Sequence, residues 1–263
     1  MVDLHLHTTY SDGNFTPKEI LEMCKVAGLE LFSITDHDNV KANKEILDEL
    51  KTKNHNIKYL IGTEITSTFK NVDIHLCCYD FDLESIEIHD IIAKTIVLRK
   101  QRIKHIAAHL AKAHGIKIPD DKVNDLLDKT NVPGQPHIAE LAMRLGLTNL
   151  SISDFIKEYI QDKKIQIAWI PAEDVIKAIH DAGGFVSLAH PFEYDKKVPD
   201  MDKFIGELKQ VGLDAVEVFC PSHDAEAIDA YTRITQKYSL KTTAGSDFHG
   251  YHPTIKIGKV TKS

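Results

Sequence analysis

The chain has 263 residues and a formal net charge of -7 at pH 7, from 32 basic and 39 acidic side chains. This length suffices for one large domain, or for a domain with an insertion, and for a substantial hydrophobic core. Because Lys and Arg are not in surplus, the chain is poorly equipped to neutralise many phosphates at once. A protein whose main task is to grip long nucleic acid is therefore excluded.

The cysteines and the first residues point to a compartment. Four cysteines occur without CxxC spacing and without the density of a disulfide framework, which favours a reduced chain with buried thiols. The first residues do not have the pattern of a signal peptide, and no apolar run approaches the length that spans a bilayer. We expect a cytoplasmic protein without a membrane partner.

Predicted strands and helices alternate in the first 83 residues and again from residue 171, which is typical of a parallel α/β fold. The predicted strands cover residues 31–35, 58–62 (running into Thr63 and Glu64), 73–79, 185–189 and 215–219, and the predicted helices cover 16–29, 39–54, 171–182, 201–211 and 224–238. Residues 84–170 instead show helix upon helix with few β-branched runs. The sequence therefore predicts an α/β domain, residues 1–83 and 171–263, that is interrupted by a helical insertion.

Two histidines are predicted to lie on one face of a strand at the start of the chain. Side chains alternate along a strand, so Asp3, His5 and His7 point one way and the apolar residues between them point the other. Neutral imidazole is a common ligand of transition metals, and an alternating pair on a rigid strand can hold one ion. The pair predicts a metal site that needs further ligands.

Residues of metal-binding type also follow the later predicted strands. The residues that we assign to the C-terminal ends of these strands are Asp36, His37, Glu64, His75, His190, His223, Asp247 and His249. In a parallel barrel the carboxyl ends of the strands share one rim, where the active sites of such folds are built. We therefore expect residues scattered along the chain to converge on one site.

In their order and context, these residues resemble the motifs of the PHP (polymerase and histidinol phosphatase) family. The resemblance is carried by His5-x-His7 with Asp12, Thr35-Asp36-His37-Asp38, Glu64, His75, His190-Pro191 and Ser246-Asp247-x-His249. It covers essentially the whole chain and is closer to the branch that contains nucleotide phosphatases, including the 3',5'-nucleoside bisphosphate phosphatase that also trims short RNA. It implies a distorted (β/α)7 TIM-like barrel with a helical insertion domain and up to three divalent metal ions. The implied metal ligands are His5, His7, Asp12, His37, Glu64, His75, His190, Asp247 and His249.

This implied ligand set has a chemical preference. Imidazoles mixed with carboxylates suit manganese, iron or zinc better than magnesium or calcium. Three carboxylates leave two to three divalent ions with net positive charge, so an anionic phosphate ester is the expected guest. Metals about 3.5–4 Å apart can bridge a hydroxide and clamp phosphoryl oxygens during in-line displacement. We expect a metal-dependent phosphoesterase for a small phosphorylated metabolite, with an AMP-like nucleotide or a 3',5'-bisphosphate as the leading candidate.

Two residues near the implied ligands are candidates for catalytic roles. His223 follows a predicted strand and is placed either to protonate the leaving alcohol or to add a further contact. Asp36 is the first candidate for a carboxylate that fixes the tautomer of a ligand histidine, and Asp38 and Asp3 are the others.

The insertion departs from the family pattern in the segment Gly134-Gln135-Pro136-His137. The resemblance places Gln135 where the nucleotide-phosphatase branch usually has an Arg two residues before a His, and both positions are associated with phosphate binding. Gln135 and His137 are therefore the implied substrate-binding residues. Because Gln carries no charge, one charge-assisted phosphate contact is missing, and the exact substrate stays open.

Three other functions remain open at this point. A 5'-3' exoribonuclease for short oligonucleotides is one, because the same hydroxide attacks monoester and diester phosphorus. Histidinol-phosphate phosphatase is less favoured, since the insertion resembles the nucleotide branch more closely. A non-catalytic metal-binding module is expected to have lost ligands, and none of the implied ligands is missing here.

Overall fold

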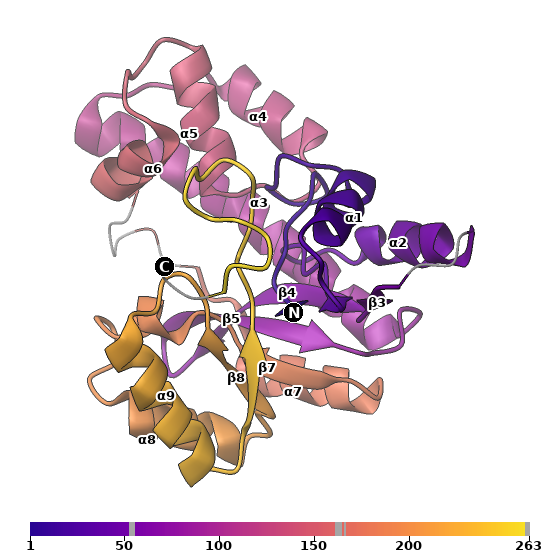
Figure 1. The fold of residues 1–263 in the computed structure, drawn as a ribbon. Helices are drawn as coiled ribbons and strands as arrows, with labels where there is room; N and C mark the ends of the chain where they lie inside the picture. Colours follow the sequence, from indigo (N-terminus) through magenta and orange to yellow (C-terminus); the bar gives the residue numbers. More distant parts are fainter. Residues whose placement is uncertain (53–55, 161–164, 166, 261–263) are drawn as a thin grey trace. The chain divides into compact units, whose positions relative to one another are not determined.

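The computed structural model describes residues 1–52, 56–160, 165 and 167–260, and the chain divides into two compact units (Figure 1). One unit comprises Met1–Ile92 and Ile170–Ser263, and the other comprises Ala93–Trp169. The first boundary falls inside helix α3 (Ile86–His114), beyond the predicted boundary at residue 84, because the first turns of this helix belong to the first unit.

In the first unit, short strands alternate with helices. The strands are β1 (Val2–Asp3), β2 (Leu31–Phe32), β3 (Lys58–Tyr59), β4 (Gly62–Phe69), β5 (Val72–Tyr79), β6 (Ile170–Pro171), β7 (Phe185–Leu188), β8 (Ala215–Phe219) and β9 (Lys241–Ala244). The helices besides α3 are α1 (Pro17–Val26), α2 (Lys41–Thr52), α7 (Ala172–Asp181), the 3-10 helix η2 (Pro191–Tyr194), α8 (Met201–Gln210) and α9 (Ala225–Lys237). Each predicted strand and helix has a counterpart, but β1 ends at Asp3, so His5 and His7 follow the strand and do not lie on it as predicted. The predicted end of the second helix at residue 54 lies outside the described residues.

The strands form two sheets that close on each other. One sheet has the order β1-β2-β3 and is parallel, and the other has the order β6-β4-β5-β7-β8-β9. Leu6 forms a bridge with Phe248 at one seam, and His37 forms a bridge with Glu64 at the other. The result is an irregular, closed α/β barrel, and the seams already bring ligand-bearing segments together.

One strand departs from the expected parallel order. The two longest strands, β4 and β5, form an antiparallel hairpin that ends with Phe69 opposite Val72, and β5 is also antiparallel to β7. The turn residues Lys70 and Asn71 have φ values of 50° and 63°, which match the twist of the strands in a two-residue hairpin. The sequence does not have the Asn-Gly signal typical of such a turn, and the prediction of parallel strands throughout was wrong here. His75 therefore lies within β5, not at the carboxyl end of a parallel strand.

Local sequence explains where the helices begin. Thr16 caps α1 in a capping box with Glu19, and Pro17 occupies the first turn. Asp200 and Asp224 cap α8 and α9 by accepting hydrogen bonds from the backbone three residues on. These caps fix the points at which the chain leaves the barrel strands and starts its return along a helix.

The second unit has a hydrophobic core of its own. Besides most of α3 it contains α4 (Asp120–Lys129), α5 (Gln135–Arg144), α6 (Ile152–Phe155) and the π-helix η1 (Ile156–Ile160). Its buried side chains include Ile103, Ile106, Leu110, Val123, Leu126, Ile138, Leu141 and Phe155. In the described part of the chain, no helix combines the length and the apolar character needed to cross a lipid bilayer.

Candidate metal centre

Glu64 lies fully buried on β4, at the centre of the implied ligand set. Its Oε1 is 3.0 Å from Nδ1 of His75 and 3.1 Å from Nε2 of His190. Its Oε2 is 2.7 Å from Nδ1 of His37. One carboxylate therefore contacts imidazoles that come from β5 and from the segments after β2 and β7.

His5 and His7, which follow β1, point into the same cluster. Nε2 of each lies 3.4 Å from Oε2 of Glu64. Asp247, after β9, lies on their other side, with its Oδ1 3.5 Å from Nε2 of His5 and 3.2 Å from Nε2 of His7. The alternation along the first segment thus places both ring nitrogens where the sequence predicts them.

Asp12 completes the far side of the cluster. Its Oδ1 is 3.3 Å from Nε2 of His249 and 3.9 Å from Nδ1 of His7. Its Oδ2 is 3.9 Å from Nε2 of His37. All nine implied ligands therefore belong to one network of carboxylates and imidazoles within the first unit.

The backbone is strained where it presents these groups. Asp38, His190 and Asp247 have φ values of 43°, 29° and 53°, in the left-handed region that residues other than glycine rarely adopt. Such a conformation costs about 1–3 kcal/mol per residue and is concentrated at functional sites. The strained residues after β7 and β9, His190 and Asp247, are thus the same residues that contribute side chains to the cluster.

The donor set fits metal ions. Several buried donor atoms that face one another make no hydrogen bond with the described residues, among them Nε2 of His5 and His7, Oδ1 of Asp12 and Oε2 of Glu64. Buried polar atoms are nearly always satisfied, so a cation is the natural partner for atoms arranged in this way. In the part of the chain that the structure describes, four groups have ligand atoms within 4.8 Å of one another: His7, Asp12, His37 and His249; His5, Glu64 and Cys77; His5, His7 and Asp247; His37, Glu64 and His75.

The pKa shifts within the cluster show how strongly its charges interact. Burial opposes protonation of His249, but the carboxylates of Asp12 and Asp247 outweigh it and raise the pKa to about 10. Burial, together with neighbouring His249 and His37, lowers the pKa of His7 to about 3. Without a metal ion, protons on some imidazoles balance the carboxylates, and a bound cation would displace them.

Cys77 is a neighbour of the cluster that sequence reasoning left out. Its Sγ lies 3.6 Å from Nδ1 of His5, and burial raises the pKa of the thiol to about 12. A thiol that holds its proton so firmly is a weak ligand compared with the surrounding imidazoles.

The sequence suggested that Asp36 fixes the tautomer of a ligand histidine, but its hydrogen bonds go to other groups. Its carboxylate accepts hydrogen bonds from Thr8 N at 2.7 Å, Thr8 Oγ1 at 2.6 Å and Ser11 Oγ at 2.7 Å. Ser11 Oγ is in turn 3.5 Å from Nδ1 of His7. Asp36 therefore holds the loop between His7 and Asp12 and reaches the His7 ring only through Ser11.

The other two suggested acceptors also hold backbone. Asp38 accepts hydrogen bonds from the backbone N and the hydroxyl of Thr66 on β4. Asp3 accepts from the backbone N of His5, of Ser246 and of Gly258, at 3.3, 2.9 and 2.8 Å. Carboxylates outside the cluster do contact implied ligand rings, and sequence reasoning missed them. Oε2 of Glu193 lies 3.5 Å from Nδ1 of His190, and Oε1 of Glu217, on β8, lies 3.0 Å from Nδ1 of His5. The signal for Glu217 was an acidic residue within the otherwise apolar strand Ala215–Phe219.

His223 is fully buried in the turn after β8. Its Nδ1 donates to the carbonyl of Val218 at 2.8 Å, and its Nε2 makes no hydrogen bond with the described residues. Burial lowers the pKa of His223. The ring is therefore neutral, with a lone pair on Nε2.

In the second unit, Gln135 and His137 lie in the first turn of α5. Nδ1 of His137 accepts a hydrogen bond from the backbone N of Gly134 at 3.1 Å, so Nε2 is the nitrogen that carries the proton. Arg99 of α3 is buried and lies beside this turn. A Cβ placed on Gly134 would be 3.7 Å from Nη1 of Arg99 and also 3.7 Å from Nδ1 of His137. Sequence reasoning missed Arg99, which belongs to a different helix from Gln135.

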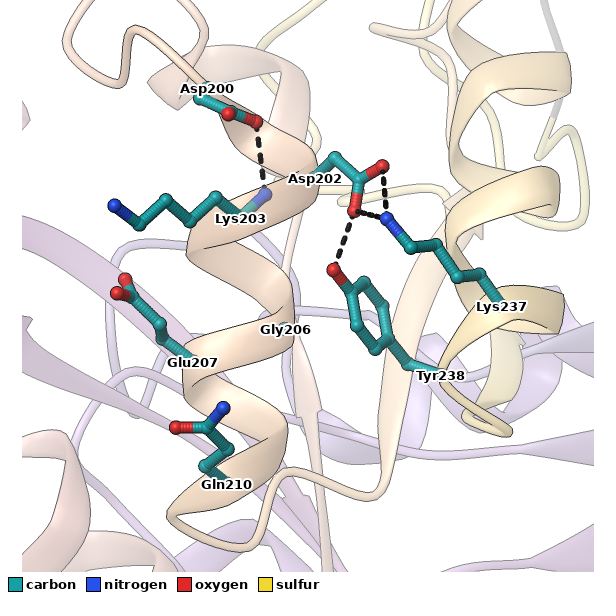
Figure 2. A pocket seen from close by; sticks show the side chains of 8 residues that line it. All are labelled: Asp200, Asp202, Lys203, Gly206, Glu207, Gln210, Lys237 and Tyr238. Carbon is teal, nitrogen blue, oxygen red and sulfur yellow. Dashed lines mark hydrogen bonds and ion pairs between the residues drawn. The ribbon is translucent and has the colours of Figure 1, made fainter.

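A hollow of about 360 Å³ lies elsewhere, along α8 and the end of α9 (Figure 2). Two of its charged side chains are paired with each other, since Asp202 accepts from Nζ of Lys237 at 2.7 Å and also from the hydroxyl of Tyr238 at 2.6 Å (Figure 2). The hollow contains none of the implied ligands.

The barrel and its buried cluster of imidazoles and carboxylates place the chain among metal-binding α/β barrels. Residues 3–211 match the PHP domain, and the chain belongs to this family.

Individual relatives agree with this assignment. The chain is 29% identical over 262 residues to the 5'-3' exoribonuclease Rnm of Salmonella typhimurium, covering 98% of this chain and 88% of the relative. It is 24% identical over 251 residues to the 3',5'-nucleoside bisphosphate phosphatase of Chromobacterium violaceum, covering 94% and 87%. A crystal structure from Bifidobacterium adolescentis, described as a metal-dependent phosphoesterase, superposes with a TM-score of 0.85 and 27% identity, covering 100% of this chain and 92% of that chain. The expected α/β barrel and the expected class, a metal-dependent hydrolase of phosphate esters, are confirmed.

Proposed function

We propose that the protein removes phosphate from a small nucleotide, with a 3',5'-bisphosphate as the leading substrate, and that two to three manganese, iron or zinc ions serve the reaction. The observation that supports this most is the buried cluster in which Glu64, Asp12 and Asp247 meet six imidazoles. A mixed nitrogen and oxygen donor set favours these metals over magnesium or calcium. Divalent ions held there would neutralise phosphoryl charge and lower the pKa of water.

His223 is proposed as a substrate contact. Because its Nδ1 is already used by the Val218 carbonyl, only Nε2 is available, and a neutral ring offers a lone pair there. It suits a hydrogen bond from a hydroxyl of the substrate better than the delivery of a proton to the leaving alcohol. Of the two roles that the sequence left open, we therefore favour the additional contact.

The first turn of α5 is proposed to bind a phosphate of the substrate. His137 presents a protonated Nε2, and the N-terminus of a ten-residue helix favours an anion. Arg99 brings a guanidinium to the same turn, and Gln135 adds a neutral amide. Arg99 would thereby supply the charge that the family pattern places at position 135.

Metal analysis followed by a phosphate-release screen tests this proposal. The protein, purified without chelator, is expected to contain two to three transition-metal ions per chain and to release phosphate from a 3',5'-bisphosphate faster than from the matching monophosphate. The Asp247→Ala variant serves as the inactive control. Retention of no more than one ion per chain, even after reconstitution with manganese, would contradict the multinuclear centre.

A second candidate is 5'-3' exonuclease action on short RNA, which the printed name of the Salmonella typhimurium relative favours. It is distinguished by comparing kcat/KM for a 5'-phosphorylated trinucleotide with kcat/KM for the bisphosphate.

A location in the cytoplasm remains a prediction from the sequence.

A further inference from the structure

Glu217 occupies an unusual place for a carboxylate. It lies in the middle of β8, between Val216 and Val218, and is 1% exposed. A buried carboxylate is unfavourable unless its oxygens accept hydrogen bonds. The partners of Glu217 therefore indicate why an acid is present at this position.

The two oxygens of Glu217 bind two separate segments of the metal centre. Oε1 accepts from Nδ1 of His5 at 3.0 Å, and Oε2 accepts from the backbone N of His190 at 2.8 Å. His190 is a residue with the unusual φ of 29°, so its backbone needs a fixed partner. Cys77 Sγ is also near Nδ1 of His5, at 3.6 Å, but a thiol is a weak hydrogen-bond partner.

The contact between Glu217 and His5 also requires a glycine at position 245. A Cβ on Gly245, directly after β9, would lie 2.4 Å from Oε1 of Glu217 and 2.2 Å from Cβ of His5. Both distances are far below van der Waals contact, so any side chain at this position would force Glu217 and His5 out of place. Gly245 therefore allows Glu217 and His5 to approach each other as they do.

We propose that Glu217 is a positioning residue that holds His5 with its proton on Nδ1. Nε2 then keeps its lone pair and faces Glu64 and Asp247, at 3.4 and 3.5 Å. A hydrogen bond to the outer ring nitrogen fixes both the tautomer and the orientation of a ligand imidazole. Through its second oxygen, Glu217 also sets the turn that carries His190. This inference rests on the metal-dependent function proposed above.

Glu217→Gln tests the proposal while it preserves the size of the side chain. The amide of Gln keeps one acceptor oxygen, but its nitrogen only donates, so the side chain cannot accept from His5 at one end and from His190 at the other. We expect the affinity for Zn²⁺, titrated against a competing chelator, to fall about 10- to 100-fold. Ser187→Ala is the matched control, because Ser187 is equally buried on the neighbouring strand β7 and its hydroxyl pairs with Thr243 at 2.8 Å. Its affinity for Zn²⁺ should equal that of the wild type.

A spectroscopic measurement on the wild type makes the test independent of how well the variants fold. In the Zn²⁺-loaded protein, ¹H–¹⁵N correlation of the histidine rings should show His5 with a protonated Nδ1. An unprotonated Nδ1 on His5, or unchanged Zn²⁺ affinity in Glu217→Gln, would overturn the proposal. If Glu217→Gln does not fold, Gly245→Ala provides a variant that displaces the pair without removing the carboxylate. Failure of the wild type to bind any of Zn²⁺, Mn²⁺ and Fe²⁺ would instead contradict the proposed function.

Discussion

Glu64 and His75 face each other across the antiparallel hairpin, with Glu64 Oε1 3.0 Å from His75 Nδ1. Glu64 pairs with Cys77 in the register of β4 and β5, which puts His75 diagonally opposite on the same face. The ligand that departs from the parallel pattern therefore still reaches the centre, because strand alternation decides its direction.

Glu64→Gln should abolish metal binding and phosphate release. The amide removes a charge that contacts His37, His75 and His190 at once, so we expect a loss of activity larger than the roughly 10- to 100-fold typical of residues behind a metal ligand. Elemental analysis and kcat/KM are the measurements. Glu84→Gln, at an exposed acid outside the cluster, is the control, and equal metal content in the two variants would contradict the assignment.

Asp36→Asn should destabilise the loop between His7 and Asp12. The carboxylate accepts hydrogen bonds from Thr8 N, Thr8 Oγ1 and Ser11 Oγ. In Asn the amide nitrogen would face at least one of these donors and could not accept its hydrogen bond. We expect the free energy of unfolding to fall by about 1–3 kcal/mol in urea denaturation of the metal-free protein. An unchanged midpoint and slope would show that the loop does not depend on this carboxylate.

His223→Ala should leave the metal content unchanged and reduce kcat/KM about tenfold, the effect of one lost hydrogen bond to substrate. Steady-state kinetics at several pH values provide the measurement. A loss beyond about 100-fold, with a displaced acid or base limb in the pH profile, would indicate proton transfer by this residue instead.

Gln135→Arg should lower the KM for a 3',5'-bisphosphate more than the KM for the matching monophosphate, since a charge-assisted contact is roughly twice as strong as a neutral one. His137→Ala should raise both KM values. Arg99→Gln should raise the KM for the bisphosphate most, if its guanidinium replaces the missing Arg. An equal effect of Gln135→Arg on both substrates would contradict a role of the insertion in reading the second phosphate.

The four cysteines should resist labelling in the native protein. All are buried, and burial raises the pKa of Cys77 and of Cys220 to about 12, so little thiolate forms near neutral pH. A thiol reagent should report no reactive group before denaturation and four afterwards. Rapid labelling of one thiol in the metal-free protein would show that the first unit opens locally.

The convergence of the nine implied ligands was predictable because their signals are local. A histidine or carboxylate at a strand end, or an alternating pair such as His5 and His7, can be recognised within a few residues. Glu217 and Arg99 act on partners elsewhere in the chain, and which residues they meet depends on strand order and helix packing. The same holds for Asp36, whose residue type was recognised but whose partners, Thr8 and Ser11, were not.

The insertion buries its apolar side chains in a cluster formed among its own helices. The stability lost through substitutions on its surface therefore comes from the core of the insertion and not from that of the barrel. Under the substrate-binding role proposed for Gln135 and His137, a lineage can alter the residues around them, and with them the range of accepted substrates, while the implied ligands of the barrel stay as they are. The proposed arrangement separates the evolution of specificity from the maintenance of chemistry.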